Sequence, residues 1–151
     1  MVADASTIHA SAVLVGPKAA LILGPAGSGK STLAWSLVTA AAQGLLTFAR
    51  LVADDRAYVE NHSARLLVRP PAALAGMIEV HGLGIRRIEF EPVAMVGLVV
   101  DLGVGDATRY PGAEGTGVMI QGVTLPRLAV APEIAALPIV LAALQTLSAD
   151  D

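Results

Sequence analysis

One stretch of the chain decides its fold: Gly24-Pro25-Ala26-Gly27-Ser28-Gly29-Lys30-Ser31. It matches the pattern G-x-x-x-x-G-K-S/T in full, with an apolar run at 19–23 before it and helix-forming residues at 31–42 after it. Glycines between a strand and a helix let successive backbone N–H groups turn towards phosphate oxygens, and the helix N-terminus adds a favourable dipole. Lys30 would bring a positive charge to the β- and γ-phosphates, and the Ser31 hydroxyl could bind Mg²⁺. The stretch therefore predicts a phosphate-binding loop for a phosphorylated nucleotide.

The 151-residue chain is rich in apolar residues and poor in charged ones. Hydrophobic residues make up 54% of it and charged residues 15%, which allows a sizeable core and excludes a disordered chain. The net charge of −3 argues against a general nucleic-acid binder, and with only two lysines in the chain the place of Lys30 is informative. No uncharged stretch has the run of about 20 dominantly apolar residues that a membrane span needs. The absence of cysteine excludes disulfides and is compatible with a cytosolic protein.

Short apolar runs separated by turns recur along the chain. The expected elements are a hairpin at 12–15 and 19–23, a hairpin at 57–60 and 65–68, strands at 48–53, 77–80, 87–90, 93–102, 118–120, 123–124 and 127–130, a long glycine-rich loop at 103–117, and helices at 31–42 and 132–147. Many strands with few helices indicate one α/β domain with a mixed sheet, not a regular alternation of strands and crossover helices.

Acidic residues follow two of the apolar runs. Asp54 and Asp55 end the run at 48–53, where a protein with this loop usually has a carboxylate that holds Mg²⁺. Neighbouring strand residues point to opposite faces, so both acids can face the phosphates only if the chain turns there; otherwise the pair are solvated turn residues. Glu79, between two apolar residues, is either an outward-facing strand residue or a metal or catalytic ligand. His9 taken alone is more often structural or exposed than catalytic.

These residues occur in an order that resembles the bacterial HPr kinase/phosphorylase family. A histidine before the loop, Ala-Asp-Asp after it, and the segment 78–85, Ile-Glu-Val-His-Gly-Leu-Gly-Ile, follow the family pattern from His9 to Ile88. The segment 122–128, Gly-Val-Thr-Leu-Pro-Arg-Leu, is similar to a later family segment. The resemblance implies a P-loop-containing mixed β-sheet of the HPr kinase and phosphoenolpyruvate carboxykinase type. It also implies that 1–151 is a single catalytic domain without the family's N-terminal domain, as in the short alphaproteobacterial form.

The resemblance further implies a role in phosphoryl transfer for each of several residues. Asp55 would be the base that deprotonates the acceptor serine, and Asp54 would support it electrostatically or through the metal. His9 would lie near the transferring group. Arg109, the only arginine in the loop ahead of the last strands, would take the place of an arginine that the family has there.

Nucleotide and metal ligands are implied in the same way. Residues 24–32 with Lys30 would hold the phosphates of ATP, and Ser31, Glu79 and Asp54 would hold Mg²⁺. The implied function is an ATP- and Mg²⁺-dependent kinase that phosphorylates a serine of HPr, a small phosphocarrier protein of the sugar phosphotransferase system. The enzyme would be cytoplasmic and hexameric, with neither nucleic-acid binding nor a membrane span.

The sequence departs from the family pattern at three places, of which the first and the third keep an alternative function open. His81 stands where the family usually has arginine, and Thr32 follows Lys30-Ser31 where glutamate is common. The segment associated with dephosphorylation has no counterpart, so the kinase direction is favoured over the reverse phosphorolysis. A small-molecule kinase and a nucleotide-sensing module with weakened catalysis remain the alternatives.

Overall fold

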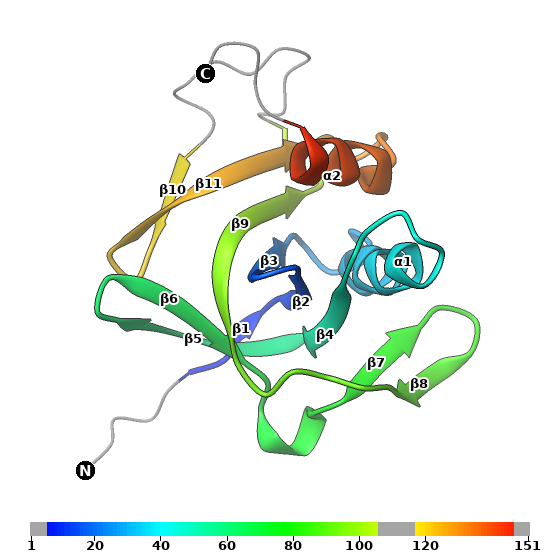
Figure 1. Cartoon of the computed structure of the whole chain (residues 1–151), viewed down its shortest axis with the longest axis horizontal. Helices are drawn as coiled ribbons and strands as arrows, with labels where there is room; N and C mark the ends of the chain where they lie inside the picture. Colours follow the sequence, from blue (N-terminus) through cyan, green and yellow to red (C-terminus); the bar gives the residue numbers. More distant parts are fainter. Residues whose placement is uncertain (1–5, 106–116, 147–151) are drawn as a thin grey trace.

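A computed structural model describes residues 6–105 and 117–146, which form a mixed sheet with two helices and a separate hairpin beside it (Figure 1). The strands are β1 (Ile8–His9), β2 (Ser11–Val15), β3 (Lys18–Leu23), β4 (Ala49–Ala53), β5 (Arg56–His62), β6 (Arg65–Arg69), β7 (Met77–Val80), β8 (Gly84–Arg87), β9 (Ala94–Leu102), β10 (Gly117–Ile120) and β11 (Val123–Val130). The helices are α1 (Lys30–Ala42), the single 3₁₀ turn η1 (Ala72–Leu74) and α2 (Ala136–Gln145).

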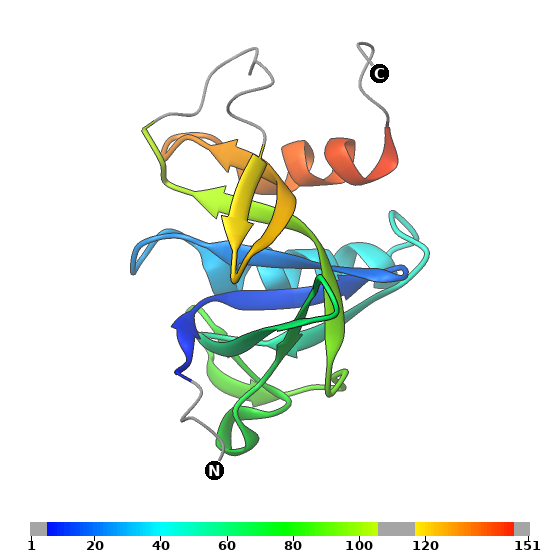
Figure 2. The same cartoon turned by 90° about the vertical axis from the view of Figure 1, so that its left-hand side faces the viewer.

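Strand β9 organises the main sheet. It lies parallel to β3 on one side, and on the other side it pairs antiparallel with β6 at its start and parallel with β11 at its end. Figures 1 and 2 show it curving across the molecule from the β5–β6 hairpin to β11. The order β1-β5-β6-β9-β3-β2-β4, with β11 and β10 attached through β9, combines parallel and antiparallel pairs. The predicted α/β fold with a mixed sheet is therefore confirmed.

Adjacent residues of the central strands enter two different cores. Leu21, Val52 and Val99 pack in a core between strands, whereas their neighbours Ile22 and Val100 pack in a second core against the helices. The alternation follows from the two-residue period of a strand, and it explains why these strands are apolar at every position.

The second core lies between the sheet and the two helices. Leu33 and Leu37 of α1 and Val140 of α2 are buried in it, together with Ile78 of the β7–β8 hairpin. Both helices therefore cover one face of the sheet, as Figure 1 shows. Neither helix of the described ranges is long and apolar enough to cross a membrane.

Several boundaries differ from those that the sequence predicted. The strand expected at 87–90 is β8, Gly84–Arg87, because it pairs with β7 across a turn that begins directly after Val80. The two runs expected at 123–124 and 127–130 form one strand, β11, since the pairing with β9 begins only at Arg127 and so does not need the N–H that Pro126 lacks. The first strand of the hairpin expected at 57–60 and 65–68 is longer than predicted, because the β5–β6 turn takes up only Ser63 and Ala64, which both have positive φ.

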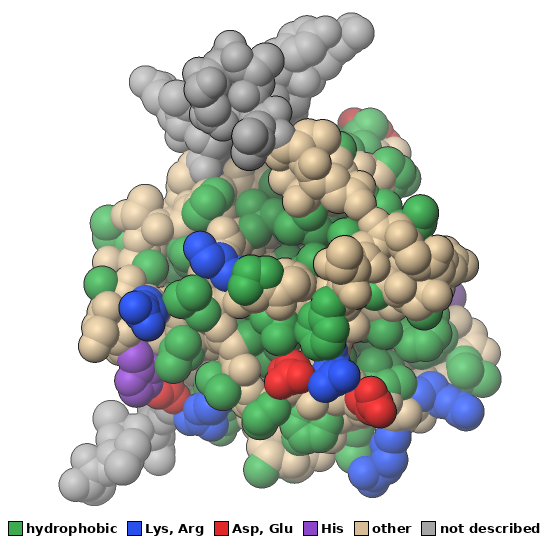
Figure 3. Space-filling view, viewed as in Figure 1, with side chains coloured by type: hydrophobic (Ala, Val, Ile, Leu, Met, Phe, Trp, Pro, Cys, Tyr) green, Lys and Arg blue, Asp and Glu red, His purple; other side chains and the backbone are tan. Residues whose placement is uncertain are grey.

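The terminal helix is shorter than the predicted 132–147. It runs from Ala136 to Gln145, and Pro138 lies in its first turn, where the missing N–H costs no helical hydrogen bond. Charged side chains gather along the lower edge of the face in Figure 3, over the region of β4 and the β7–β8 hairpin. One such cluster joins Arg50 of β4 to Glu89 and Glu91.

Candidate active site

The phosphate-binding loop connects β3 to α1. Gly29, the residue before the helix, has φ of 97°, a left-handed conformation that favours glycine. Among the described residues, no side chain caps the N-terminus of α1, and no acidic residue stands in its first turn. The first N–H groups of this 13-residue helix therefore remain available to an anion, at the positive end of the helix dipole.

At the other end of the loop, Gly24 leaves room for the Ser28 side chain. A Cβ on Gly24 would lie 2.5 Å from Ser28 Oγ and 3.0 Å from the carbonyl oxygen of Leu102. The Ser28 hydroxyl is buried and has no hydrogen-bond partner in the described part of the chain. A loop with uncapped N–H groups and an unpartnered hydroxyl fits a ligand rich in acceptor oxygens, such as a polyphosphate.

Lys30 bends back over the same loop. Its Nζ donates hydrogen bonds to the carbonyl oxygens of Gly24, at 2.8 Å, and Pro25, at 3.2 Å. Charge-assisted bonds to phosphate oxygens are stronger than bonds to neutral carbonyls, so a bound phosphate competes for the ammonium group. Lys30 is thus held close to the place where the phosphates are expected.

Asp54 is buried behind the loop, with an exposed fraction of 5%, and accepts three hydrogen bonds. Its Oδ1 accepts from Ser31 Oγ at 2.7 Å and from Ser11 Oγ at 2.6 Å, and its Oδ2 accepts from the backbone N–H of Glu79 at 2.9 Å. These contacts join the end of β4 to β2, α1 and β7. The carboxylate therefore holds the first turn of α1 in place against three separate strands.

Asp55 lies next to Asp54 but is exposed, because the chain turns sharply between them. Asp55 has φ of 69°, and the Arg56 N–H donates to the Asp54 carbonyl oxygen at 2.8 Å. A hydrogen bond from residue i+2 to residue i across a left-handed central residue is the mark of a γ-turn, which is rare and strained. The chain therefore turns between the two acids, which is the condition that both must meet to face the phosphate side.

Most of the predicted site residues line one cleft of about 610 Å³. Its lining comprises residues from both ends of the phosphate-binding loop together with His9, Asp55, Glu79 and His81. Asp54 lies behind this cleft and does not line it. Arg109 lies outside the described residues. The fold thus brings together residues from β1, the β3–α1 loop, the β4–β5 turn and the β7–β8 hairpin, and the roles predicted for them stay predictions.

The oxygen atoms beside the loop suit a hard cation. Ser31 Oγ and Asp54 Oδ1 are hydrogen-bonded neighbours, and magnesium is usually held by one or two carboxylates or hydroxyls together with phosphate oxygens and water. Among the described residues, no group of three or more His, Asp or Glu side chains could hold a metal by itself. The residues therefore fit a metal that binds together with a phosphate ligand, not one caged by the protein.

Comparison with known proteins identifies the family. The family model of the HPr serine kinase C-terminal domain matches residues 1–91, which hold β1 to β8 and the whole cleft. The chain belongs to the HPr serine kinase family. The HPr(Ser) kinase/phosphatase from Coxiella burnetii has a similar structure, with a TM-score of 0.70 and 23% sequence identity over 91% of this chain and 92% of that chain. No curated protein sequence matches the chain significantly.

The resemblance that the sequence motifs indicated is thus confirmed, and so is the type of fold. The structural similarity covers 91% of this chain and so extends beyond residue 91, into the part of the chain that forms β9, β10 and β11.

Ser11 is a residue of the site that sequence reasoning missed. It is fully buried on β2, donates to Asp54 Oδ1, and its Oγ also lies 3.4 Å from the Asp55 N–H, which donates to it. The only signal in the sequence was a hydroxyl residue in an otherwise apolar strand two residues after His9. This one hydroxyl contacts both members of the acidic pair, Asp54 and Asp55.

Proposed function

We propose that this HPr kinase family member transfers the γ-phosphoryl group of ATP to a serine of the phosphocarrier protein HPr, with Mg²⁺. One observation carries the proposal: the phosphate-binding loop and the exposed carboxylate of Asp55 line the same cleft. The donor phosphates bind to the N–H groups of the loop and of α1, and Lys30 leaves the loop carbonyls to neutralise the β- and γ-phosphates.

Asp55 is the general base of the transfer. Its carboxylate accepts the proton of the serine hydroxyl while the serine oxygen bonds to the γ-phosphorus, and the bond from that phosphorus to the β–γ bridging oxygen breaks to release ADP. The exposure of Asp55 suits a protein substrate, because a serine on another molecule can reach it from solvent. Asp54, buried behind the cleft, acts as a positioning residue through Ser31.

Mg²⁺ would be held by Ser31, Asp54 and Glu79, and when bound it supplies positive charge against the phosphate oxygens. For the chain itself, the hydrogen bond from the Glu79 N–H to Asp54 sets the position of β7 beside the first turn of α1. His9 lines the cleft and would contact the transferring group, and Arg109 would add a positive charge to it. The proposal includes a single catalytic domain, a hexamer and a cytoplasmic location, as the family resemblance implies.

The test is a phosphorylation assay. The chain is incubated with HPr, ATP and Mg²⁺, and phosphoserine on HPr is sought by mass spectrometry; a second arm adds excess inorganic phosphate to phosphorylated HPr to detect the reverse reaction. Phosphoserine formation supports the proposal. An absence of transfer while the chain still binds nucleotide contradicts it.

A nucleotide-sensing module is a second candidate, favoured by His81. This histidine lines the cleft where the family pattern has arginine, so a fixed positive charge is replaced by a titratable one. ATP turnover measured with and without HPr separates the two functions, because a kinase requires the acceptor and a sensing module is indifferent to it.

A further inference from the structure

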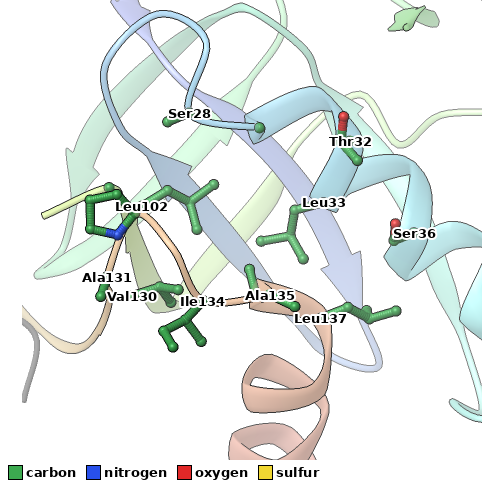
Figure 4. A pocket seen from close by; sticks show the side chains of 14 residues that line it. Ser28, Thr32, Leu33, Ser36, Leu102, Val130, Ala131, Ile134, Ala135 and Leu137 are labelled. Carbon is green, nitrogen blue, oxygen red and sulfur yellow. The ribbon is translucent and has the colours of Figure 1, made fainter. Parts of the chain in front are cut away.

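The β7–β8 hairpin has an outer edge that no other strand of the described residues covers. β8 pairs only with β7, and all four of its residues, from Gly84 to Arg87, are exposed. Figure 1 shows the hairpin at the lower right, apart from the main sheet. The apolar cavity in Figure 4, by contrast, shares Gly29 and Thr32 with the cleft and so belongs to the site already described.

The register of the hairpin shows which backbone groups of β8 face outward. The Ile88 N–H donates to the Gly76 carbonyl oxygen at 2.8 Å, and hydrogen-bonded pairs alternate along an antiparallel ladder. Positions 84, 86 and 88 therefore bond to β7, whereas the N–H and C=O groups of Ile85 and Arg87 point away from it. Such an edge is a template for one further strand.

The side chains of β8 give this edge an apolar position and two positive charges. Ile85 has an exposed fraction of 70%. Arg86 and Arg87 are exposed, and neither has an ion pair within the described ranges. The nearby Arg50 differs, because its guanidinium is bound to Glu91 at 2.9 Å. The two arginines of β8 are therefore free to bind carboxylates from outside the chain.

An open hollow continues this edge beyond the end of β8. It is lined by Arg50, Arg87, Ile88, Glu89 and Phe90. Phe90 forms an isolated backbone bridge with Leu51 of β4, so the hollow lies where the hairpin joins the main sheet. It offers the half-exposed ring of Phe90 and the unpaired charge of Arg87 to whatever runs along β8.

The alternation of side chains along β8 sets the residues that a paired strand must carry. Ile85 and Arg87 share one face of the strand, and Arg86 lies on the other. Opposite charges and apolar pairs directly across a ladder are stabilising, and like charges are destabilising. An antiparallel strand therefore complements β8 with two consecutive acidic residues followed by an aliphatic one. A second copy of β8 would bring two more arginines to the edge and no carboxylate.

We propose that the outer edge of β8 is a docking site for an extended acidic segment of another protein. The segment adds to the hairpin as an antiparallel third strand and presents acidic, acidic and aliphatic residues to Arg87, Arg86 and Ile85 in that order. Backbone hydrogen bonds supply affinity, and the carboxylates supply specificity. The same hairpin carries Glu79 and His81 of the cleft, so the docked segment lies beside the candidate active site.

The probe for the experiment is a labelled peptide, Thr-Ser-Glu-Glu-Val-Ser-Thr, whose binding to the whole chain is followed by fluorescence anisotropy. Two N-methylated forms test the strand pairing. A methyl group on the valine nitrogen removes a donor that faces β8. A methyl group on the nitrogen of the second glutamate removes a donor that faces away, so this form is the matched control. A third form has lysine in place of both glutamates.

We expect methylation at the valine, and exchange of both glutamates for lysine, each to weaken binding at least about tenfold. Methylation at the second glutamate should change the Kd less than about twofold. Equal affinity of the two methylated peptides would overturn the proposal. So would the absence of saturable binding up to about 1 mM, because the arginines would then only guard the edge against pairing.

Arg87→Glu tests the charge on the edge. We expect it to weaken binding of the glutamate peptide by about threefold or more, since it replaces an ion pair by a repulsion. Arg65→Glu, an exposed arginine on β6 with the same change in net charge, is the control and should leave the Kd unchanged. Equal affinity in the two variants would contradict the assignment of the carboxylates to β8.

Amide hydrogen exchange of the unaltered chain locates the peptide without any variant. The peptide should slow exchange at Ile85 and Arg87 at least about tenfold and leave Arg86, already bonded to β7, unchanged. Binding without this protection overturns the proposal. Slow exchange at both positions before peptide is added would also overturn it, because the edge would already be paired with a second copy. A chain that phosphorylates HPr but binds no peptide refutes only this inference.

Discussion

At the scale of single residues, the two adjacent acids have different environments. Asp54 is buried with three hydrogen-bond donors, and Asp55 is exposed on a γ-turn at the cleft. The strained backbone at Asp55 is held by the first residue of β2 and the residue before it: the Ala10 N–H donates to the Asp55 carbonyl oxygen, and the Asp55 N–H donates to Ser11 Oγ. A position that costs backbone energy and presents a carboxylate to a cleft is typical of a functional site.

Replacing Asp55 by asparagine tests its assignment as the base. The amide keeps the shape but cannot accept the serine proton, so we expect the rate of HPr phosphorylation to fall by about 100-fold or more while the Kd for ATP is unchanged. Glu89→Gln, an exposed acid outside the cleft, is the control. Undiminished transfer by the Asp55 variant would remove Asp55 as the base.

Ser11→Ala tests the hydroxyl that contacts both acids. The substitution removes a donor to buried Asp54 and the acceptor of the Asp55 N–H, so we expect a loss of about 1–3 kcal/mol in the free energy of unfolding. We also expect kcat for HPr to fall more than the affinity for ATP, because Asp55 loses its positioning contact. Urea denaturation and initial rates measure the two effects. Ser6→Ala, at an exposed position, should change neither, and a kcat equal to that of the unaltered chain would show that Ser11 is structural only.

At the scale of elements, the turn from β3 into α1 depends on Gly24. Its φ is 155°, and a Cβ there would meet Ser28 Oγ at 2.5 Å. We expect Gly24→Ala to shift the loop, to weaken ATP binding by about tenfold or more, and to cost about 1–3 kcal/mol of stability. Calorimetry and thermal denaturation check this. Gly105→Ala is the matched control, since a Cβ at that glycine meets no atom within 4 Å. Equal ATP affinity in the two variants would contradict the prediction.

The β5–β6 hairpin carries a pH-dependent contact away from the cleft. Hydrogen bonds from His62 and Arg69 hold the pKa of Glu60 below its ordinary value. A lowered pKa in the folded state means that the stabilisation is present at neutral pH and is lost as the pH falls below the usual carboxyl range, about 4. We expect Glu60→Gln to destabilise the chain slightly at pH 7 and not at pH 3, and less at high salt because the group is partly exposed. An unfolding difference that does not vary with pH would refute this.

At the scale of the whole molecule, the two cores share strands. Leu66 is buried in the core between strands and Leu37 in the core against the helices, and β3, β4 and β9 contribute alternate residues to both. Unfolding of either core should therefore unfold the other.

We expect Leu37→Ala and Leu66→Ala each to cost about 2–5 kcal/mol and to leave a single unfolding transition. Circular dichroism follows the whole sheet, and the fluorescence of Trp35 follows α1. Coincident curves in both variants fit the prediction of one domain over 1–151, and two separate transitions would contradict it.

Sequence order by itself determined the mixed α/β class and the family, and it predicted the phosphate-binding loop, because the loop residues are contiguous and the other motifs keep a fixed order. It also placed Asp55, His9 and Glu79 among the candidates. The sequence did not predict the boundaries of β8 and β11, because the residues at which a strand begins and ends depend on the strand it pairs with.

The tertiary structure alone decided which acid is buried and how Ser11 enters the site. Ser11 is 43 residues from Asp54 and 44 residues from Asp55, and it contacts both. Such contacts arise when β2, β4 and β9 pair in one sheet, and no local pattern records that pairing. The loop that decides the fold can therefore be predicted from contiguous residues of the sequence. The side chains around the loop that would make it a catalytic site come from strands that are distant in sequence.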